Sequence, residues 1–162
     1  MGVELRHETA IGATPDAVWQ ALVDVAAWPE WNPTLSSADG PLGEGKWVAM
    51  TLQLGRRRRK VHQHVSPVDV PHRLAWRSRN LFEKFMDVDR TFDLVPTPEG
   101  GTLLVQAEVA HGPVAPVALL FLKGKILDGY VALGEALRRR LEPDYDETQT
   151  AAPPAARPES AP

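Results

Sequence analysis

The long segment at residues 115–141 is the feature that most constrains what this chain can fold into. On a period of 3.6 residues its large apolar side chains fall on one narrow stripe: Leu119, Leu122, Ile126, Tyr130, Leu133 and Leu137. Pro116 suits a first helical turn, the arginines at 138–140 complement the negative end of a helix dipole, and Pro143 follows. The pattern predicts one helix about 40 Å long, at about 1.5 Å per residue, and such a helix needs a large surface to lie on.

One flank of this stripe carries small residues, namely Ala118, Gly129 and Ala136. Glycine inside a helix costs about 1 kcal/mol relative to alanine, so Gly129 calls for a reason. Two interpretations account for it: close packing against a neighbouring strand, or a cavity roofed by this flank.

Composition predicts one domain with a sizeable core, since 43% of the 162 residues are hydrophobic. Without cysteine there are no disulfides, thiolate metal sites or cysteine nucleophiles, which fits a reducing compartment. The first residues lack an apolar signal stretch, and no apolar run approaches the roughly 20 residues of a membrane span. We therefore expect a cytoplasmic protein without stable membrane insertion, as a monomer or a homodimer.

The net charge of −3 comes from the end of the chain, because residues 143–162 hold four acids and one arginine. The body is left with 17 acidic and 17 basic residues. A formally neutral body argues against a nucleic-acid binder, which needs a basic face. We predict a domain over residues 1–142 and a disordered Pro/Ala-rich tail over 143–162.

The chain before the long helix predicts one strand, two short helices and then strands only. Residues 3–11 form the first strand, and Thr14 caps a helix that runs to about Val25. The sequence Trp-Pro-Glu-Trp-Asn-Pro at 28–33 predicts a tight helical turn that buries both indoles, as core or as a sandwich for an aromatic ligand. Strands are then predicted at 46–54, 58–66, 73–79, 84–95 and 102–110, with a short extra one at 34–38. Short connections make this an antiparallel meander, and the fold class α+β.

Alternation along each strand predicts which side chains face the helix. The inward rows are Val48, Met50, Leu52 and Leu54; Val61, Gln63 and Val65; Leu74, Trp76 and Ser78; Met86, Val88, Arg90, Phe92 and Leu94; and Leu103, Val105, Ala107 and Val109. The outward rows carry His62, His64 and charges, with Asp87, Asp89 and Asp93 able to pair across strands with Arg73, Arg77 and Arg79.

Arg90 breaks the inward pattern, because it stands between Val88 and Phe92. A buried guanidinium without a partner is costly, so Arg90 needs a carboxylate of the protein or an anionic or carbonyl group of a ligand, unless its long side chain reaches the sheet edge.

Together these segments resemble the SRPBCC superfamily, the START and birch-pollen-allergen-like helix-grip proteins. The resemblance rests on the first strand, Thr-Pro-Asp-Ala-Val-Trp-Gln-Ala-Leu at 14–22, the tryptophan turn at 28–33, residues 65–76 and the long last helix. Within the superfamily the bacterial polyketide cyclase/dehydrase and lipid-transport group is most similar.

The resemblance implies a curved antiparallel sheet that grips the long helix, with an apolar cavity between them for lipids, polyketides or other hydrophobic molecules. We expect this ligand-binding cavity to be lined by Met50, Leu52, Gln63, Trp76, Ser78, Val88, Arg90, Phe92, Ile126 and Tyr130. The Tyr130 hydroxyl would bond a ligand or a buried water.

Enzyme motifs for serine hydrolysis, phosphate binding and zinc are absent from the sequence. His62 and His64 are interpreted as solvated rather than metal-binding, and His7 as a core residue rather than a base. We expect no metal and no cofactor.

The leading hypothesis is a carrier or sequestering protein for a hydrophobic small molecule. The alternative is a polyketide aromatase/cyclase acting in the same cavity, for which the sequence offers only Arg90, Tyr130, Ser78 and His7 as proton donors or acceptors. A third hypothesis is an interaction protein that uses the tail. The basic run at 56–60 is interpreted as a solvated hairpin, with contact to an anionic membrane or nucleic acid as the other interpretation.

Overall fold

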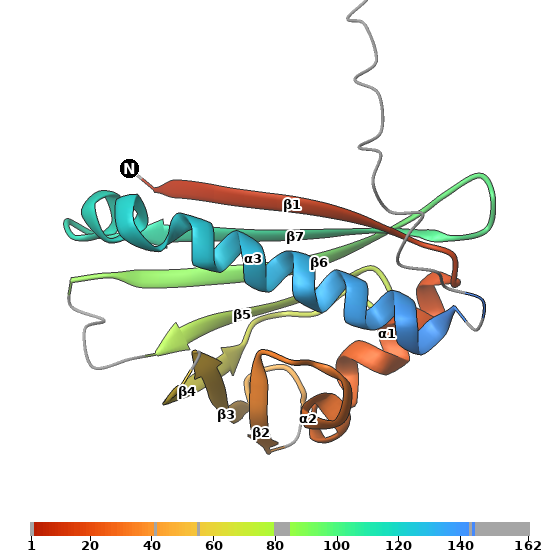
Figure 1. Ribbon diagram of the computed structural model, residues 1–162, viewed down its shortest axis with the longest axis horizontal. Helices are drawn as coiled ribbons and strands as arrows, with labels where there is room; N and C mark the ends of the chain where they lie inside the picture. Colours follow the sequence, from red (N-terminus) through yellow and green to blue (C-terminus); the bar gives the residue numbers. More distant parts are fainter. Residues whose placement is uncertain (1, 41, 55, 80–84, 143, 145–162) are drawn as a thin grey trace, which may run out of the picture.

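A seven-stranded antiparallel sheet and one long helix make up most of the molecule (Figure 1). The computed structural model describes residues 2–40, 42–54, 56–79, 85–142 and 144. The strand order is β1-β7-β6-β5-β4-β3-β2. In chain order the elements are β1 (Val3–Ile11), α1 (Pro15–Val23), the 3-10 turn η1 (Val25–Ala27), α2 (Trp28–Trp31), β2 (Leu35–Asp39), β3 (Trp47–Leu54), β4 (Arg57–Val65), β5 (Arg73–Arg79), β6 (Asp87–Pro96), β7 (Thr102–His111) and α3 (Ala115–Leu141). The predicted α+β helix-grip architecture is confirmed.

Local sequence signals account for most element boundaries. Thr14 caps α1 by accepting a hydrogen bond from the backbone N–H of Ala17, with Pro15 at the first helical position. Strand β5 and helix α3 begin and end where predicted, and the short extra strand exists as β2. The strand predicted from Lys84 begins later, at Asp87, since Phe85 and Met86 precede it outside the strand. Lys84 itself and the predicted tail at 143–162, apart from Asp144, lie outside the described residues.

The second half of α3 is seated firmly on β1 and α1. Leu133 and Leu137 are buried there, and a Cβ built on Gly134 would lie only 2.9 Å from Cγ2 and 3.0 Å from Cβ of Thr9 in β1. Close packing against a strand therefore occurs at Gly134. The helix end is also tied down, because the carboxylate of Glu142 accepts a hydrogen bond of 2.7 Å from the backbone N–H of Gly12.

The first half of α3 is much more exposed to solvent. Leu119 is buried, but every residue from Leu120 to Lys125 is exposed. The prediction that Leu122 belongs to the buried stripe is therefore wrong: its side chain is 41% exposed. The reason is geometric, since α3 packs mainly along β1, and Leu122 lies on the flank turned away from that strand.

The predicted phase of β7 is also wrong. Directly opposed residues of an antiparallel pair share a face, and the register pairs Arg90 with Glu108 and Phe92 with Gln106. The row facing the helix is therefore Leu104, Gln106, Glu108 and Ala110, and not Leu103, Val105, Ala107 and Val109. The outer row of Leu103, Val105, Ala107 and Val109 is wholly apolar, and its Val105 is buried, so hydrophobicity alone indicates the wrong phase.

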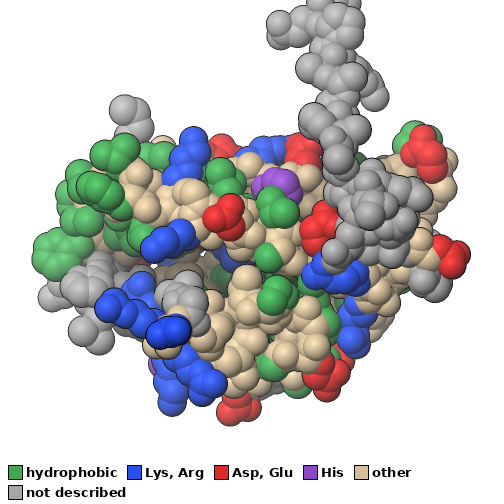
Figure 2. Space-filling view, viewed as in Figure 1, with side chains coloured by type: hydrophobic (Ala, Val, Ile, Leu, Met, Phe, Trp, Pro, Cys, Tyr) green, Lys and Arg blue, Asp and Glu red, His purple; other side chains and the backbone are tan. Residues whose placement is uncertain are grey.

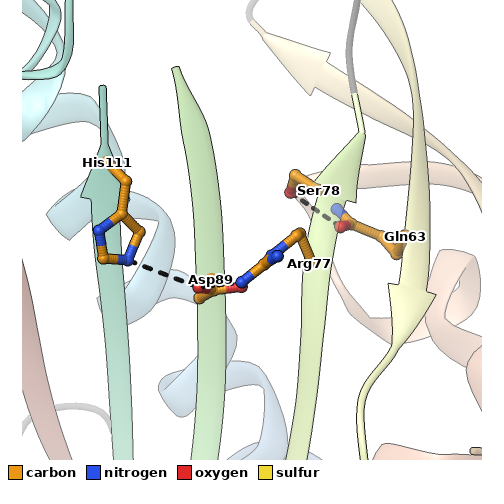
Figure 3. Close-up of polar contacts among 5 residues, drawn as sticks. All are labelled: Gln63, Arg77, Ser78, Asp89 and His111. Carbon is orange, nitrogen blue, oxygen red and sulfur yellow. Dashed lines mark hydrogen bonds and ion pairs between the residues drawn. The ribbon is translucent and has the colours of Figure 1, made fainter. Parts of the chain in front are cut away.

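The outer face of the sheet carries the predicted charge pairs. Arg77 donates two hydrogen bonds to the Asp89 carboxylate, at 2.7 and 2.9 Å, and His111 Nε2 lies 3.5 Å from the same carboxylate (Figure 3). Arg73 and Asp93 lie 3.3 Å apart, whereas the side chain of Arg79 is outside the described set. These pairs link β5 to β6 and help to fix their register.

We expect Asp89→Asn to lower the free energy of unfolding slightly at neutral pH, and to make it fall less steeply as the pH drops into the acid range. The hydrogen bond from Arg77 lowers the pKa of Asp89, so its contribution to stability is complete above the ordinary aspartate pKa and is lost as the pH falls through the lowered value. Because the pair is exposed, the free energies of unfolding of the wild-type protein and Asp89→Asn should differ by about 0.5 kcal/mol at neutral pH. Urea unfolding at neutral pH and below pH 4 would measure it, with Asp93→Asn, at the looser pair, as control. A difference that does not shrink in acid would contradict the assignment.

The buried apolar residues form two clusters rather than one continuous core. The larger one gathers α1, α2 and the middle of the sheet, including Trp28, Trp76, Phe92, Leu133 and Leu137. The smaller one lies under the first half of α3 and consists of Leu5, Val88, Ala110, Ala115, Leu119 and Tyr130. In the described part of the chain no helix is both long enough and apolar enough to cross a bilayer.

Candidate ligand-binding site

Arg90 stands at the boundary between the two apolar clusters. Its strand neighbours on the same face belong to different clusters, Val88 to the smaller and Phe92 to the larger. Its guanidinium carbon lies 4.8 Å from the centre of the Phe92 ring and 4.5 Å from the centre of the Tyr130 ring. Two aromatic faces therefore contact the cation and contribute favourable cation–π energy.

The partner that Arg90 requires is a neutral amide. Its Nη2 donates a hydrogen bond of 3.0 Å to Oε1 of Gln106. Among the described residues no carboxylate lies within ion-pair distance of Arg90, although Glu108 is directly opposite on β7. The positive charge is thus held by rings and an amide and is not neutralised by an ion pair.

Two buried donors on this face lack an acceptor. Arg90 Nε and Trp76 Nε1 have no exposed surface and no hydrogen-bond partner within the described structure. Their residues are directly opposed on β6 and β5, so both donors belong to the same patch of the sheet. Unsatisfied buried donors cost about 1–3 kcal/mol each, and an acceptor brought by a ligand would recover that energy.

A chain of hydrogen bonds links Arg90 to helix α3. Gln106, which accepts from Arg90, donates through Nε2 to the backbone carbonyl of Tyr130 at 2.8 Å. The Tyr130 hydroxyl donates in turn to the Glu108 carboxylate at 3.0 Å. Burial raises the pKa of Tyr130 far above its ordinary value, Arg90 opposes this effect, and Glu108 adds to it. Tyr130 is therefore a neutral phenol that donates hydrogen bonds and does not act as a base.

Two further polar residues lie along the same face. Ser78 donates a hydrogen bond of 2.8 Å to Oε1 of Gln63, joining β5 to β4 (Figure 3). Gln63 is buried and Ser78 half-buried. Figure 3 also shows the Arg77–Asp89–His111 group. Arg77 and Ser78 are consecutive on β5, so the two groups belong to opposite faces of the sheet.

Aromatic rings form the wall below Arg90. The Trp76 ring lies 4.9 Å from Phe92 and 5.8 Å from Trp28, and Trp31 lies 5.6 Å from Trp28. Trp28 Nε1 donates to the carbonyls of Ala21 and Leu22, which fixes this indole in the core. Trp28 and Trp31 are tilted by 56° and not stacked in parallel, so they do not form the two faces of a sandwich.

Open space adjoins the flank of α3 at Gly129. A Cβ built on Gly129 would meet no atom within 4 Å, unlike that on Gly134. Five residues of helix separate these glycines by about 140° around the axis, so Gly129 and the exposed Leu122 face away from β1. Figure 2 shows the surface hollowed beside the first half of α3. The flank of small residues thus meets open space at Gly129.

The structure brings most of the predicted lining residues together, but not all. Arg90 contacts the rings of Phe92 and Tyr130, and Trp76 packs against Phe92. Gln63 and Ser78 are paired on the same face, and Val88 and Ile126 belong to the smaller cluster. Met50 and Leu52 pack with the larger cluster on β3, beyond Gln63.

Sequence reasoning missed Gln106 and Glu108 because it assigned them to the outer face. The available signal was polarity: of the two rows of β7, one carries both polar side chains, and the inward Arg90 already required a partner. The predicted histidines lie where their strands place them. His62 lies on the outer face and His7 on the inner row, and within the described residues no cluster of histidine and acidic side chains has the geometry of a metal site.

A curved antiparallel sheet, closed by a long C-terminal helix with two short helices at its side, defines the helix-grip ligand-binding fold. The chain belongs to the polyketide cyclase/dehydrase and lipid transport family, whose model matches residues 2–147. No curated protein matches its sequence.

Solved structures with this fold carry different activities. The Zhui aromatase/cyclase from Streptomyces sp. R1128 has a TM-score of 0.75 at 15% identity and covers 92% of this chain and 99% of its own. Norcoclaurine synthase from Thalictrum flavum has a TM-score of 0.68 at 18% identity, with 86% of each chain covered. Ara h 8.0201 has a TM-score of 0.69 at 15% identity and covers 87% of this chain and 98% of its own. At these identities the similarity establishes the fold alone.

Proposed function

We propose that this protein binds a hydrophobic small molecule bearing a carbonyl or carboxylate group, between the sheet and α3, as its carrier or sequestering protein. Arg90 is the observation that carries the proposal. It is a guanidinium between two apolar clusters, with no carboxylate partner among the described residues and with a buried Nε that has no acceptor. A ligand acceptor at this point would complete its hydrogen bonding.

The distribution of apolar and polar groups supports this class of ligand. Apolar clusters lie on both sides of Arg90, so a hydrophobic body can contact them while one polar end meets Arg90 Nε and Trp76 Nε1. Apolar walls with a few placed polar groups are typical of small-molecule sites. Membership in a lipid-transport and cyclase family is consistent with a hydrophobic ligand.

The state of the other polar groups favours binding over chemistry. Gln63 and Ser78 bond each other, Gln106 is bonded on both sides, and Tyr130 is bonded to Glu108. The two buried groups beside Phe92 that lack partners, Arg90 Nε and Trp76 Nε1, are hydrogen-bond donors, which orient an acceptor but do not remove a proton. We further propose that residues 1–142 form this binding domain, that 143–162 are a tail outside it, and that the protein acts in the cytoplasm.

A second candidate is a polyketide cyclase/dehydrase, and the pair formed by Tyr130 and Glu108 favours it. Aldol closure needs a base to take a proton from the carbon between two ketones and an acid to protonate the new alkoxide, before water is lost. The Glu108 carboxylate would be the base, and the neutral phenol of Tyr130, with Arg90 beside it, the acid.

We expect a stoichiometric hydrophobic molecule with a carbonyl or carboxylate group on protein purified from its own host. Native mass spectrometry would detect it, and denaturing extraction followed by accurate-mass analysis would identify it. If the extracted molecule is recovered unchanged after incubation with the protein, the result supports a carrier. Conversion of an added poly-β-ketone to an aromatic product favours the second candidate. An empty protein that gains no thermal stability from fatty acids, sterols or aromatic polyketides would contradict both.

A further inference from the structure

The first half of α3 exposes a second apolar face, directed away from the sheet. Val117, Leu120 and Phe121 are 60%, 79% and 75% exposed. At about 100° per residue they fall, with Val114, within about 120° on the side of the helix opposite Leu119. Phe85 adjoins them, since its backbone carbonyl accepts a hydrogen bond from the N–H of Val114, and it is itself exposed. We call Phe85, Val114, Val117, Leu120 and Phe121 the α3 apolar patch.

This patch is not what packing against a sheet requires. A helix with one buried face normally presents polar residues to solvent, and the second half of α3 does so with Asp128 and Arg139. Contiguous exposed apolar patches mark interaction sites. In Figure 2 hydrophobic side chains gather at the end of the molecule where α3 begins.

Exposed cations surround the α3 apolar patch. Lys123 and Lys125 lie on either side of it by helical periodicity, and both are exposed. The basic run 56–60 is exposed at the same end of the sheet, because the register places the β3–β4 hairpin, the end of β5, the start of β6 and the end of β7, which leads into α3, at that end. Of the acids at this end, Asp89 is already paired with Arg77, Asp87 is half-buried, and Glu4 at the start of β1 is exposed.

We propose that this end of the molecule docks on the surface of an anionic lipid bilayer, with the α3 apolar patch entering the interface and Lys123, Lys125 and the run 56–60 contacting lipid phosphates. Amphipathic surfaces that combine exposed aromatic and aliphatic side chains with flanking cations bind such interfaces without spanning them.

Charge argues against a second copy of the chain as the occupant. In a symmetric dimer the same surface meets itself, which would bring Lys123, Lys125 and the basic run of both copies close together, where these cations outnumber the exposed Glu4. A bilayer rich in anionic lipid supplies the opposite charge. The proposal rests on exposure and charge alone and is independent of what the site beside Arg90 binds.

The test is flotation of the full chain with vesicles of phosphatidylcholine, with and without phosphatidylglycerol. We expect binding that needs phosphatidylglycerol and weakens with added salt. The double variant Leu120→Ser with Phe121→Ser, and separately Lys123→Glu with Lys125→Glu, should each reduce partitioning on the order of tenfold or more. Val95→Ser and Lys46→Glu are matched controls, since both residues are exposed at the opposite end of the sheet and should leave partitioning unchanged.

Three results would overturn the proposal. One is failure of the wild-type chain to float with either kind of vesicle, and another is equal flotation of the wild-type chain and both double variants. The third is a dimer in light scattering that the serine double variant converts to a monomer, because the patch would then be covered by a second copy. Circular dichroism of each variant verifies that its fold is intact, which substitution of exposed side chains should preserve.

Discussion

Replacing Gly134 by leucine is expected to lower the free energy of unfolding by about 3 kcal/mol or more. The added side chain would enter the contact between α3 and β1, where a Cβ alone already lies 2.9 Å from Thr9 Cγ2 and nearer still to Thr9 Oγ1. Thr9 cannot retreat cheaply, because β1 is paired with β7 along its whole length. Urea unfolding followed by circular dichroism would measure the loss.

Gly129→Leu is the matched control, because it makes the same chemical change in the same helix. A side chain there meets open space at its Cβ, and leaving glycine gains up to about 1 kcal/mol of helix propensity, so stability should be unchanged or slightly higher. Ligand affinity should fall, since this flank borders the proposed site. Equal damage from both substitutions would show that the seating of the helix is not specific to Gly134, and unchanged binding by Gly129→Leu would locate the ligand elsewhere.

Arg90→Met is expected to weaken the binding of an anionic ligand while the protein stays folded. Losing the charge-assisted bond should weaken an anionic hydrophobic ligand by about 1.5–3 kcal/mol, which is roughly 10- to 150-fold in the dissociation constant. The empty protein should lose no more than about 1–3 kcal/mol of stability, because methionine keeps an apolar side chain of similar length and the half-buried Arg90 has no ion pair among the described residues, while Oε1 of the buried Gln106 loses its donor. A variant that merely damaged the fold would lose both.

Two fluorescent probes make this test independent of the natural ligand. Anilinonaphthalene sulfonate is anionic, and N-phenylnaphthylamine is a neutral aromatic of similar size. Arg90→Met should weaken the sulfonate and leave the neutral probe nearly unchanged, while the exposed Arg59→Met should alter neither. Equal effects of Arg90→Met on both probes, or no effect on either, would remove Arg90 from the proposed role.

The architecture could be predicted from sequence because its signals are local. Helix α3 has an apolar stripe long enough to define both of its ends, and β5 is bounded by clear turn residues. Inward-facing rows on β3 to β6 followed from alternation, because each of those strands has one apolar and one polar row. The departure of Arg90 from that alternation was sufficient to single it out before any contact was known.

The errors occurred where the local pattern is misleading or incomplete. In β7 the wholly apolar row faces outward, and pairing with β6 decides that Gln106 and Glu108 face the helix. The stripe of α3 was extended to Leu122 because periodicity shows which side of a helix is apolar but not where its partner surface stops. The orphan donors of Arg90 and Trp76 depend on side-chain placement, which no sequence period encodes.

The separation of the two faces of the sheet bears on how such proteins diversify. The outer pairs of Arg77 with Asp89 and Arg73 with Asp93 help to hold strand register, while the inner row around Arg90 meets the proposed ligand. Substitutions that change ligand choice therefore fall on side chains that alternate with, and do not interrupt, those that fix the register. Inner residues can therefore be exchanged without disturbing the outer pairs that help to hold the strands in register.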